Sequence, residues 1–341
     1  MTEQELTRRA KRRLAILRHA EEITGNVADT MVFDDKLREW ENFCNCHRPT
    51  AAWWPARSTC SRGRAGDRGI RQDQEGGTDR VISPVGRHDM ARISYDEQTA
   101  AAFKAVREVP RDGLLEWREA VRRHLRPSQG MTLVDIGAGT GVFAAAFSDW
   151  FDLSVLAVEP SAGMRDQIPR TPAIQVLAGD ASALPLPDRS ADAAWISLVL
   201  HHIPDLGVAA HEIRRVLRPG APILIRQGFP SRLDGVELVR WFPETARAVD
   251  TYPSVNDTCK AFAAAGFHQD ALERVRETWP TSLADFLDQV DTFRQADTTM
   301  RSLTEDEFLC GKERLRRAVR HAEDTANPGP RSNWLDLLVL R

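Results

Sequence analysis

The sequence predicts an α/β fold in which a parallel sheet is covered by helices on both faces. From about residue 90 onward, short apolar segments alternate with stretches of helical periodicity. The first apolar segment runs into a glycine-rich turn, and acidic residues stand near the ends of the first three. Alternation of this kind is typical of β-α-β units, whose strands run parallel and whose helices cover the sheet.

Five segments have the length and apolar content of buried strands, and turn residues bound each of them. Two helical stretches, 95–110 and 113–127, precede the first strand. Pro219 and Gly220 predict a sharp helix end before the fifth strand, because both residue types interrupt helices. The expected strands are 131–137, 153–160, 173–180, 191–200 and 221–229, and the expected helices between them are 142–151, 161–168 and 208–217.

The C-terminal part predicts two more strands with a helical insertion between them. Residues 259–279 have the pattern of a helix, a glycine turn and a strand, and residues 333–341 have that of a final strand. The segment between them, about 280–330, contains helical patterns at 282–293 and 304–323. Such a segment is too long for a plain hairpin loop, so we expect a helical insertion.

Composition narrows the possible roles of the chain. Its 341 residues include 46 basic and 49 acidic side chains, so net charge provides no argument for a nucleic-acid or membrane partner. No apolar run approaches the length of about 18 residues that a membrane span needs. The charged N-terminus lacks the apolar segment of a signal peptide, and five cysteines, an odd number, fit reduced thiols in the cytoplasm.

Two N-terminal zones differ from the rest of the chain. Residues 1–50 have broken helical patterns, whereas residues 51–89 are rich in Gly and Arg and have almost no apolar period. Because such a segment cannot bury enough surface to offset its chain entropy, we expect a disordered linker. Its arginines make a nucleic-acid tail the alternative, which the shortage of interleaved aromatic residues disfavours.

The glycine turn after the first expected strand limits the ligand that it can hold. Its glycines, Gly137, Gly139 and Gly141, follow a G-x-G-x-G pattern, and Asp135 stands two residues before the first of them. No Gly-Lys-Ser/Thr follows, and Val142 stands where a dinucleotide turn needs Gly or Ala. The carboxylate of Asp135 would repel a pyrophosphate and attract an ammonium group. S-adenosyl-L-methionine (SAM) has an ammonium group and no phosphate, and backbone approaches a ligand closely at glycine.

Acidic residues also follow the next two expected strands. Glu159 lies about twenty residues after the turn, where a carboxylate accepts hydrogen bonds from both ribose hydroxyls of SAM or of a dinucleotide. Asp180 ends the third strand, where it can accept from an adenine amino group, and Ala181 follows for backbone contact. We expect these acids to meet at one rim of the sheet, where ligands bind in this architecture.

Five motifs in series resemble those of the class I SAM-dependent methyltransferases, in the branch that acts mostly on small molecules. Over residues 90–341 the motifs are VDIGAGTG, VEPSAGM, GDASALPLPDRSADAAW, LVLHHIPD and EIRRVLRPGAPILI, in the usual order and spacing. The resemblance implies a Rossmann-like, seven-stranded, mostly parallel sheet with its last strand antiparallel, and methyl transfer from SAM to a small-molecule acceptor. It also implies that SAM contacts come from Asp135, Gly137, Ala138, Gly139, Gly141, Glu159, Pro160, Met164, Asp180, Ala181 and Ser197. For Met164, plain core packing is the alternative.

Two histidines are the candidates for a chemical role. Methyl transfer mainly needs alignment of acceptor and donor, and it needs a base only where the acceptor keeps a proton. His201 and His202 follow the fourth expected strand, toward the methyl side of the cofactor, and histidine titrates near neutrality. Either one can take a hydroxyl proton, and the alternative for each is a structural role in the loop. The sequence does not distinguish between the two.

Other features have plainer interpretations. A set of aromatic side chains either lines or caps an apolar acceptor pocket or packs in the core: Trp241, Phe242, Tyr252 and Phe262, with the helical insertion after Trp279. Cys44, Cys46 and His47 lie too close together for one tetrahedral ion and lack a partner pair, so no metal site is expected.

A second resemblance concerns the N-terminal zone. Residues 12–30 resemble the start of an insertion-sequence integrase and residues 32–50 its C-terminal end, without the nuclease core that should separate them. Transposase chemistry therefore does not carry over. We expect a transposase remnant fused in front of a methyltransferase whose natural start is near Met90, and a chain from Met90 that failed to fold would contradict this. The alternative function is a DNA-associated fusion protein with a vestigial or regulatory SAM-binding fold.

Overall fold

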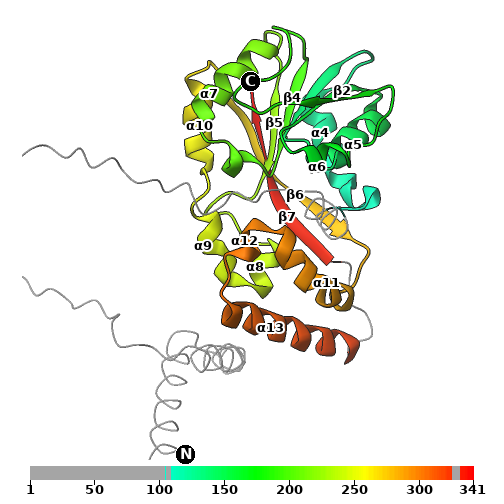
Figure 1. Cartoon of the computed structure of the whole chain (residues 1–341), viewed down its shortest axis with the longest axis vertical. Helices are drawn as coiled ribbons and strands as arrows, with labels where there is room; N and C mark the ends of the chain where they lie inside the picture. Colours follow the sequence, from blue (N-terminus) through cyan, green and yellow to red (C-terminus); the bar gives the residue numbers. More distant parts are fainter. Residues whose placement is uncertain (1–103, 105–108, 325–330) are drawn as a thin grey trace, which may run out of the picture. The chain divides into compact units, whose positions relative to one another are not determined.

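The described residues contain a seven-stranded sheet, with its strands in the order β3-β2-β1-β4-β5-β7-β6. Figure 1 shows strands of this sheet with the helices that flank them. The computed structural model describes residue 104 and residues 109–324 and 331–341. Strands β1 to β5 are mutually parallel, whereas β7 pairs antiparallel with both β5 and β6. The predicted fold class, including the antiparallel last strand, is confirmed. The strands are β1 Thr132–Ile136, β2 Ser154–Glu159, β3 Ile174–Ala178, β4 Ala193–Ser197, β5 Ile223–Gln227, β6 Gln269–Trp279 and β7 Arg331–Leu340.

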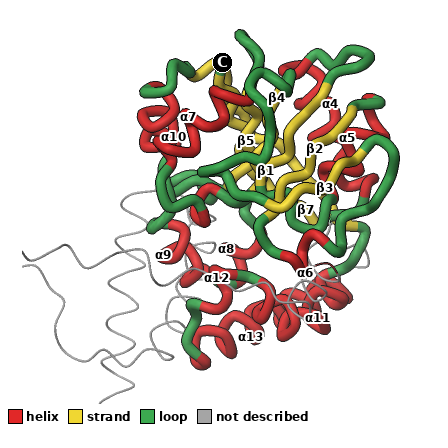
Figure 2. The backbone as a smooth tube through the Cα atoms, turned by 45° about the horizontal axis from the view of Figure 1, so that its top comes forward, coloured by secondary structure: helices red, strands yellow, loops and turns green. Residues whose placement is uncertain are grey.

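Helices cover both faces of the sheet (Figure 2). α4 and α5 pack against one face, and α7 and α10 pack against the other. Because successive strand residues point to opposite faces, Leu133 of β1 belongs to the first cluster and Val134 to the second. These elements are η1 Arg111–Leu114, α4 Leu115–Leu125, α5 Val142–Phe151, α6 Ala162–Arg165, η2 Leu200–His202, α7 Leu206–Val216 and α10 Val255–Ala263.

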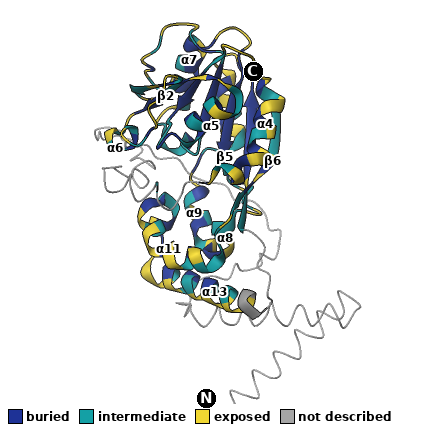
Figure 3. Cartoon of the chain, turned by 90° about the vertical axis from the view of Figure 1, so that its right-hand side faces the viewer, coloured by how far each residue is buried: buried dark blue, intermediate teal, exposed yellow. Residues whose placement is uncertain are grey.

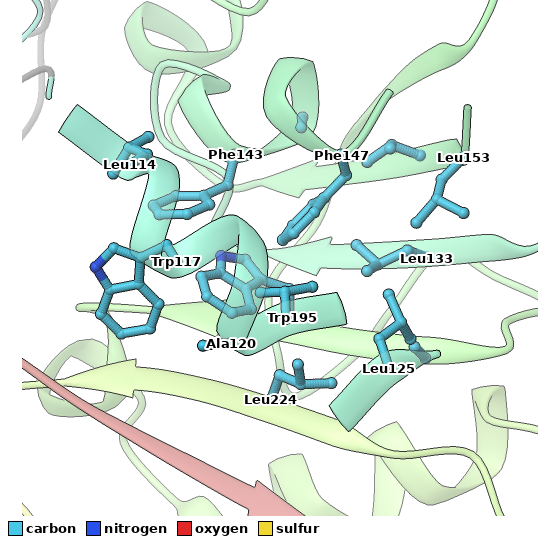
Figure 4. Close-up of a cluster of buried hydrophobic side chains, with 14 of the residues drawn as sticks. Leu114, Trp117, Ala120, Leu125, Leu133, Phe143, Phe147, Leu153, Trp195 and Leu224 are labelled. Atoms are coloured by element: carbon cyan, nitrogen blue, oxygen red, sulfur yellow. The ribbon is translucent and has the colours of Figure 1, made fainter. Parts of the chain in front are cut away.

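Trp195 of β4 lies within the aromatic cluster of the first face (Figure 4). The centroid of its ring is 4.7 Å from that of Phe143, 5.1 Å from that of Phe147 and 6.0 Å from that of Trp117. All four rings are buried, and such ring pairs add about 0.5–1.5 kcal/mol each beyond the burial of their area. The cluster therefore holds α4 and α5 against β4, the neighbour of the strand that ends at the glycine turn.

β6 and β7 continue past the end of β5 as a two-stranded ribbon that leads to a group of helices, here called the cap. Residues 336–340 of β7 pair with β5, whereas residues 331–335 pair only with β6. The cap has a hydrophobic cluster of its own, and α13 exposes its outer face (Figure 3). The cap consists of α8 Glu237–Trp241, η3 Pro243–Thr245, α9 Ala246–Val249, α11 Leu283–Ala296, α12 Thr298–Arg301 and α13 Glu305–Asp324. Helices α11 to α13 lie in the insertion expected at about 280–330.

Several predictions concern residues outside the described part of the chain. They are the helical fragments of 1–50, the linker of 51–89 and the set Cys44, Cys46 and His47. Within residues 109–324 and 331–341, no helix combines the length and the apolar character that a membrane crossing requires. The described side chains also contain no group of three or more His, Cys, Asp and Glu placed to hold a metal ion.

Candidate cofactor and acceptor site

A cavity of about 1100 Å³ opens at the carboxyl ends of the parallel strands. Open α/β sheets bind ligands at this edge. The volume exceeds the about 300–1,000 Å³ of a pocket for one ligand, so the cavity has room for two molecules. Its lining includes every expected site residue except Gly141: Asp135, Gly137, Ala138, Gly139, Glu159, Pro160, Met164, Asp180, Ala181, Ser197, His201 and His202.

The glycine turn has the backbone conformation that its residues predict. Gly137 and Gly139 have φ angles of +70° and +56°, in the left-handed region that other residues rarely adopt. The amide groups of Gly137 and Ala138 donate to the carbonyl oxygen of Val158 at 2.8 and 3.1 Å, which ties the turn to β2. A Cβ atom at Gly139 would meet no atom within 4 Å, so this glycine faces open space in the cavity.

Gly141 has a role different from the expected one. It is the N-cap of α5, and a Cβ atom there would lie 2.7 Å from Cγ2 of Ile168 and 3.1 Å from Cδ of Pro169. Gly141 therefore allows α5 to pack against the segment that follows α6, and it is not part of the cavity lining. The sequence pattern does not reveal this, because the close neighbour lies far along the chain.

Glu159 joins the glycine turn to the end of β2. Its carboxylate accepts hydrogen bonds from the amides of Gly139 and Ser161, both at 2.9 Å. The residue is 6% exposed, and burial raises the pKa of its carboxyl above the ordinary value. Each of its oxygens keeps lone-pair capacity toward the cavity that it lines, so ribose hydroxyls can donate to it.

Asp135 is a second buried carboxyl at the same rim. It is 2% exposed, and its Oδ2 has no hydrogen-bond partner. Burial, and to a lesser extent repulsion by Glu159, raises the pKa of Asp135 to about 8. A cationic group in the cavity would relieve both effects, and a phosphate would worsen them. The residues at this rim therefore fit the ammonium group and the ribose of SAM.

The other expected cofactor residues have definite places around the cavity. Met164, on α6, is buried at 3% exposure and still lines the cavity. The carboxylate of Asp180 is exposed and accepts from the amide of Ser182 at 2.7 Å. The hydroxyl of Ser197, at the end of β4, accepts from Nη1 of Arg226 at 3.1 Å. The arrangement thus brings residues of four loops to one ligand-sized space.

His201 and His202 both line the cavity after β4, on η2. The ring of His201 stacks on that of Tyr252 with centroids 4.0 Å apart and an interplanar angle of 8°. The two histidine rings are 4.1 Å apart. This packing orients the ring of His201 in the loop.

Residues 134–225 match a family described as a methyltransferase domain. This range begins in β1, ends in β5 and includes the glycine turn, Glu159 and both histidines. These residues are thus similar to a methyltransferase domain, and the cavity that they line fits SAM. A crystal structure from Anabaena variabilis, described as a methyltransferase of an antibiotic biosynthesis pathway, has the same fold. The TM-score is 0.54 at 20% identity, over 67% of this chain and 97% of that one.

Curated relatives agree with the assignment of the methyltransferase domain. A demethylmenaquinone methyltransferase of Corynebacterium kroppenstedtii is 38% identical over 109 residues, which are 32% of this chain and 47% of the relative. A demethylmenaquinone methyltransferase of Renibacterium salmoninarum is 33% identical over 150 residues, 40% of this chain and 63% of the relative. A malonyl-[acyl-carrier protein] O-methyltransferase of Yersinia pestis is 35% identical over 139 residues, 39% of this chain and 51% of the relative. The chain therefore spans less than two thirds of the length of these relatives.

The methyltransferase domain continues its cavity beyond the histidines toward the cap. This part, here called the acceptor half, is lined by residues from 226–252, 277–299 and 331–335. Its apolar lining includes Leu233, Val236, Leu238, Val239, Trp279 and Phe286. Of the four aromatic residues considered from the sequence, Tyr252 lines the cavity, whereas Trp241, Phe242 and Phe262 pack in hydrophobic clusters away from it. Trp279, at the start of the insertion, also lines the cavity.

Sequence reasoning missed a buried polar network in the acceptor half. Arg226 of β5 forms an ion pair with Glu277 of β6, and both are at most 5% exposed. Asn333 of β7 donates to the other oxygen of Glu277 at 2.9 Å. A second pair joins Arg331 to Glu237 at 2.6 Å. In the sequence, Arg226 is visible only as a charged residue near the end of an apolar strand, and this does not identify its partner.

The two glycines of the turn predict different effects of the same substitution. Gly139→Ala is expected to place a methyl group in open cavity, lowering SAM affinity by about ten- to hundredfold through overpacking of the ligand. Its cost to folding is limited to about 1–2 kcal/mol of left-handed backbone strain. Gly141→Ala adds a clash with Ile168, which costs about 1–3 kcal/mol more. Calorimetric SAM titration and thermal unfolding of both variants check this, and equal SAM affinities in well-folded variants would contradict it.

Proposed function

We propose that the protein is a methyltransferase that transfers the methyl group of SAM to a small-molecule acceptor. The observation that carries the proposal is one continuous cavity with two unlike ends. The carboxyls of Asp135 and Glu159 and the bare backbone of Gly139 line one end, and apolar side chains of the cap line the other. A cationic nucleoside at the first end and an apolar molecule at the second meet beside His201 and His202.

The residues of the chain supply binding, alignment and exclusion of water. SAM, when bound, would supply a methyl group on a positively charged sulfur, and that sulfur is the leaving group when the acceptor takes the methyl carbon. Asp135 and Glu159 are placed to hold the ammonium group and the ribose, and Gly139 lets the backbone approach. Side chains of the cap form part of the wall of the acceptor half. Alignment of two bound reactants contributes up to about 7–11 kcal/mol to such a reaction.

The relatives support a small acceptor without naming it. Two of them are named for demethylmenaquinone and a third for a malonyl group on a carrier protein, so the relatives are named for different acceptors. The DNA-associated alternative concerns the N-terminal zones, which lie outside the described residues, and these names do not favour it. For this chain we therefore propose a small-molecule acceptor.

Two measurements on the full chain test the proposal. Calorimetric titration should show SAM binding with one site per chain, and nicotinamide or flavin nucleotides should not bind. Incubation with SAM labelled in its methyl group and fractions of a metabolite extract should then label a small molecule. Tight binding of a nicotinamide or flavin nucleotide with no affinity for SAM would overturn the proposal.

We also propose that His201 or His202 takes the proton of the acceptor. Replacing each by alanine is expected to leave SAM affinity within about twofold, because both stand on η2 after β4, whereas Asp135 and Glu159 stand on β1 and β2. Loss of a positioned base lowers turnover by about 10²–10⁴-fold, so one of the two variants should show this loss. His211, an exposed histidine of α7, provides the matched control in H211A. Unchanged turnover in both H201A and H202A would rule out a histidine base.

A further inference from the structure

Gln227 ends β5 between the histidine loop and the cap, with a polar group that the protein leaves unused. The residue is 2% exposed and lines the cavity, and its Oε1 has no hydrogen-bond partner. Its amide nitrogen faces the carbonyl oxygen of Gly228 at 3.4 Å. Because that carbonyl can only accept, the orientation leaves the side-chain oxygen of Gln227 available. A buried acceptor without a partner is costly unless a ligand satisfies it.

Gln227 and the two histidines line the same cavity, and the backbone that carries them is adjacent. The amide of Leu198 donates to the carbonyl of Arg226 at 2.9 Å, so the loop that bears the histidines adjoins the end of β5. Ser197 of β4 pairs in register with Arg226, the neighbour of Gln227. A ligand that contacts the histidines and the apolar wall therefore has Gln227 within its surroundings.

The charged side chains of the acceptor half are engaged by other groups of the protein. Arg226 is paired with Glu277, and Arg331 with Glu237. Asp297 accepts from the amides of Thr299 and Met300 at the start of α12. Each arginine is balanced by one carboxylate, and only Nε of Arg226 lacks a hydrogen-bond partner, so an anionic acceptor would add an unpaired charge, which is costly to bury. The rest of the wall is mainly apolar and aromatic, with the uncharged polar residues Thr245, Thr298, Thr299 and Asn333 among it.

We propose that the acceptor is a neutral, largely apolar molecule whose hydroxyl or N–H group donates a hydrogen bond to Oε1 of Gln227. This inference rests on the proposed methyl transfer and specifies the substrate class of the same site. Gln227 thereby selects acceptors with a donor group over apolar molecules of the same shape. The paired arginines disfavour carboxylates and phosphates.

Three matched probes test the inference without any need for turnover. They are para-cresol, its apolar isostere para-xylene and the anion para-toluate, each titrated against the full chain saturated with S-adenosylhomocysteine. Ligand-observed NMR measures the affinities in the wild type and in Q227M, whose side chain has a similar shape and no amide. Q175M, an exposed glutamine of β3, is the matched control, and Q227L is a second apolar variant should Q227M fail to fold.

The expected result is a change in preference and not a general loss of binding. The affinity ratio of para-cresol to para-xylene should fall about tenfold in Q227M and stay unchanged in Q175M, as expected for one hydrogen bond to a buried acceptor. Para-toluate should bind most weakly to the wild type. An unchanged ratio in Q227M, absent para-cresol binding, or stronger binding of para-toluate would overturn the inference alone. Failure to bind S-adenosylhomocysteine would overturn the proposed function and the inference together.

Discussion

Glu277→Ala is expected to destabilise the methyltransferase domain by about 3–5 kcal/mol, because it leaves the guanidinium of Arg226 buried without a counter-charge. Arg226 is 5% exposed and lies over the rings of Trp117 and Phe143, each 5.3 Å from its guanidinium carbon. Neither ring carries a charge that could replace the lost carboxylate. Asn333 loses its acceptor in the same variant. Urea denaturation followed by circular dichroism measures the change in the free energy of unfolding.

An exposed ion pair beside the buried one provides a matched control for this prediction. Arg276 pairs with Glu116, and both side chains are nearly half exposed. Glu116→Ala is expected to change the free energy of unfolding by no more than about 1 kcal/mol, since exposed pairs contribute little. Replacing both partners of the buried pair by leucine should recover much of the stability that E277A loses. Equal effects of E277A and E116A on the free energy of unfolding would contradict the prediction, because they would show that loss of Glu277 leaves no costly unpaired charge on Arg226.

Binding of SAM is expected to strengthen by about 50-fold between pH 6 and pH 8, as Asp135 ceases to hold a proton. In the unliganded domain the pKa of Asp135 is raised to about 8 by burial and by Glu159, so its carboxyl is protonated at lower pH. The cofactor's ammonium group favours the ionised form, and binding below pH 8 must therefore release that proton. Affinity then rises about tenfold per pH unit until it levels off near pH 8.

The release of the proton is directly measurable. Calorimetric titrations near pH 7 in two buffers of different ionisation enthalpy should report about one proton released per SAM bound. Asp135→Asn should bind SAM more weakly, release no such proton and show a flatter pH dependence. Titration of the cofactor's own amino group is the same for both proteins and cancels in the comparison. Identical pH profiles for the wild type and D135N would contradict the role given to Asp135.

The raised pKa of Asp135 also makes the free energy of unfolding depend on pH. A carboxyl whose pKa is raised from 3.8 to about 8 on folding holds a proton that the unfolded chain releases over this interval. The free energy of unfolding of the unliganded domain therefore falls as pH rises through the interval. Asp135→Asn should remove this part of the pH dependence.

The cofactor rim was largely predictable because its residues act through short stretches of chain. Gly137, Gly139 and Asp135 lie within one strand and turn. Glu159 is the last residue of β2, and Asp180 lies two residues after β3. Parallel strands bring such ends to one edge whatever their order, so the ligand edge followed from the pattern alone. Gly141 was assigned to the cofactor because the G-x-G-x-G spacing does not show which glycine has Ile168 behind it.

The acceptor half was not predictable in the same way. Arg226 and Glu277 are 51 positions apart, and Glu277 and Asn333 are 56 apart. Their contact depends on β7 lying antiparallel beside β5 and on the ribbon that β6 and β7 form beyond it. Gln227 had no distinguishing sequence signal, since its importance comes from burial without a hydrogen-bond partner.

Local patterns were thus enough to predict the alternation of strands and helices, the glycine turn and the acids beside it, because hydrophobic periodicity and backbone conformation act over a few residues. The neutral, paired lining of the acceptor half and the availability of Gln227 depended on the packing of distant strands. Burial and pairing are properties of a three-dimensional surrounding, and no short stretch of chain contains them.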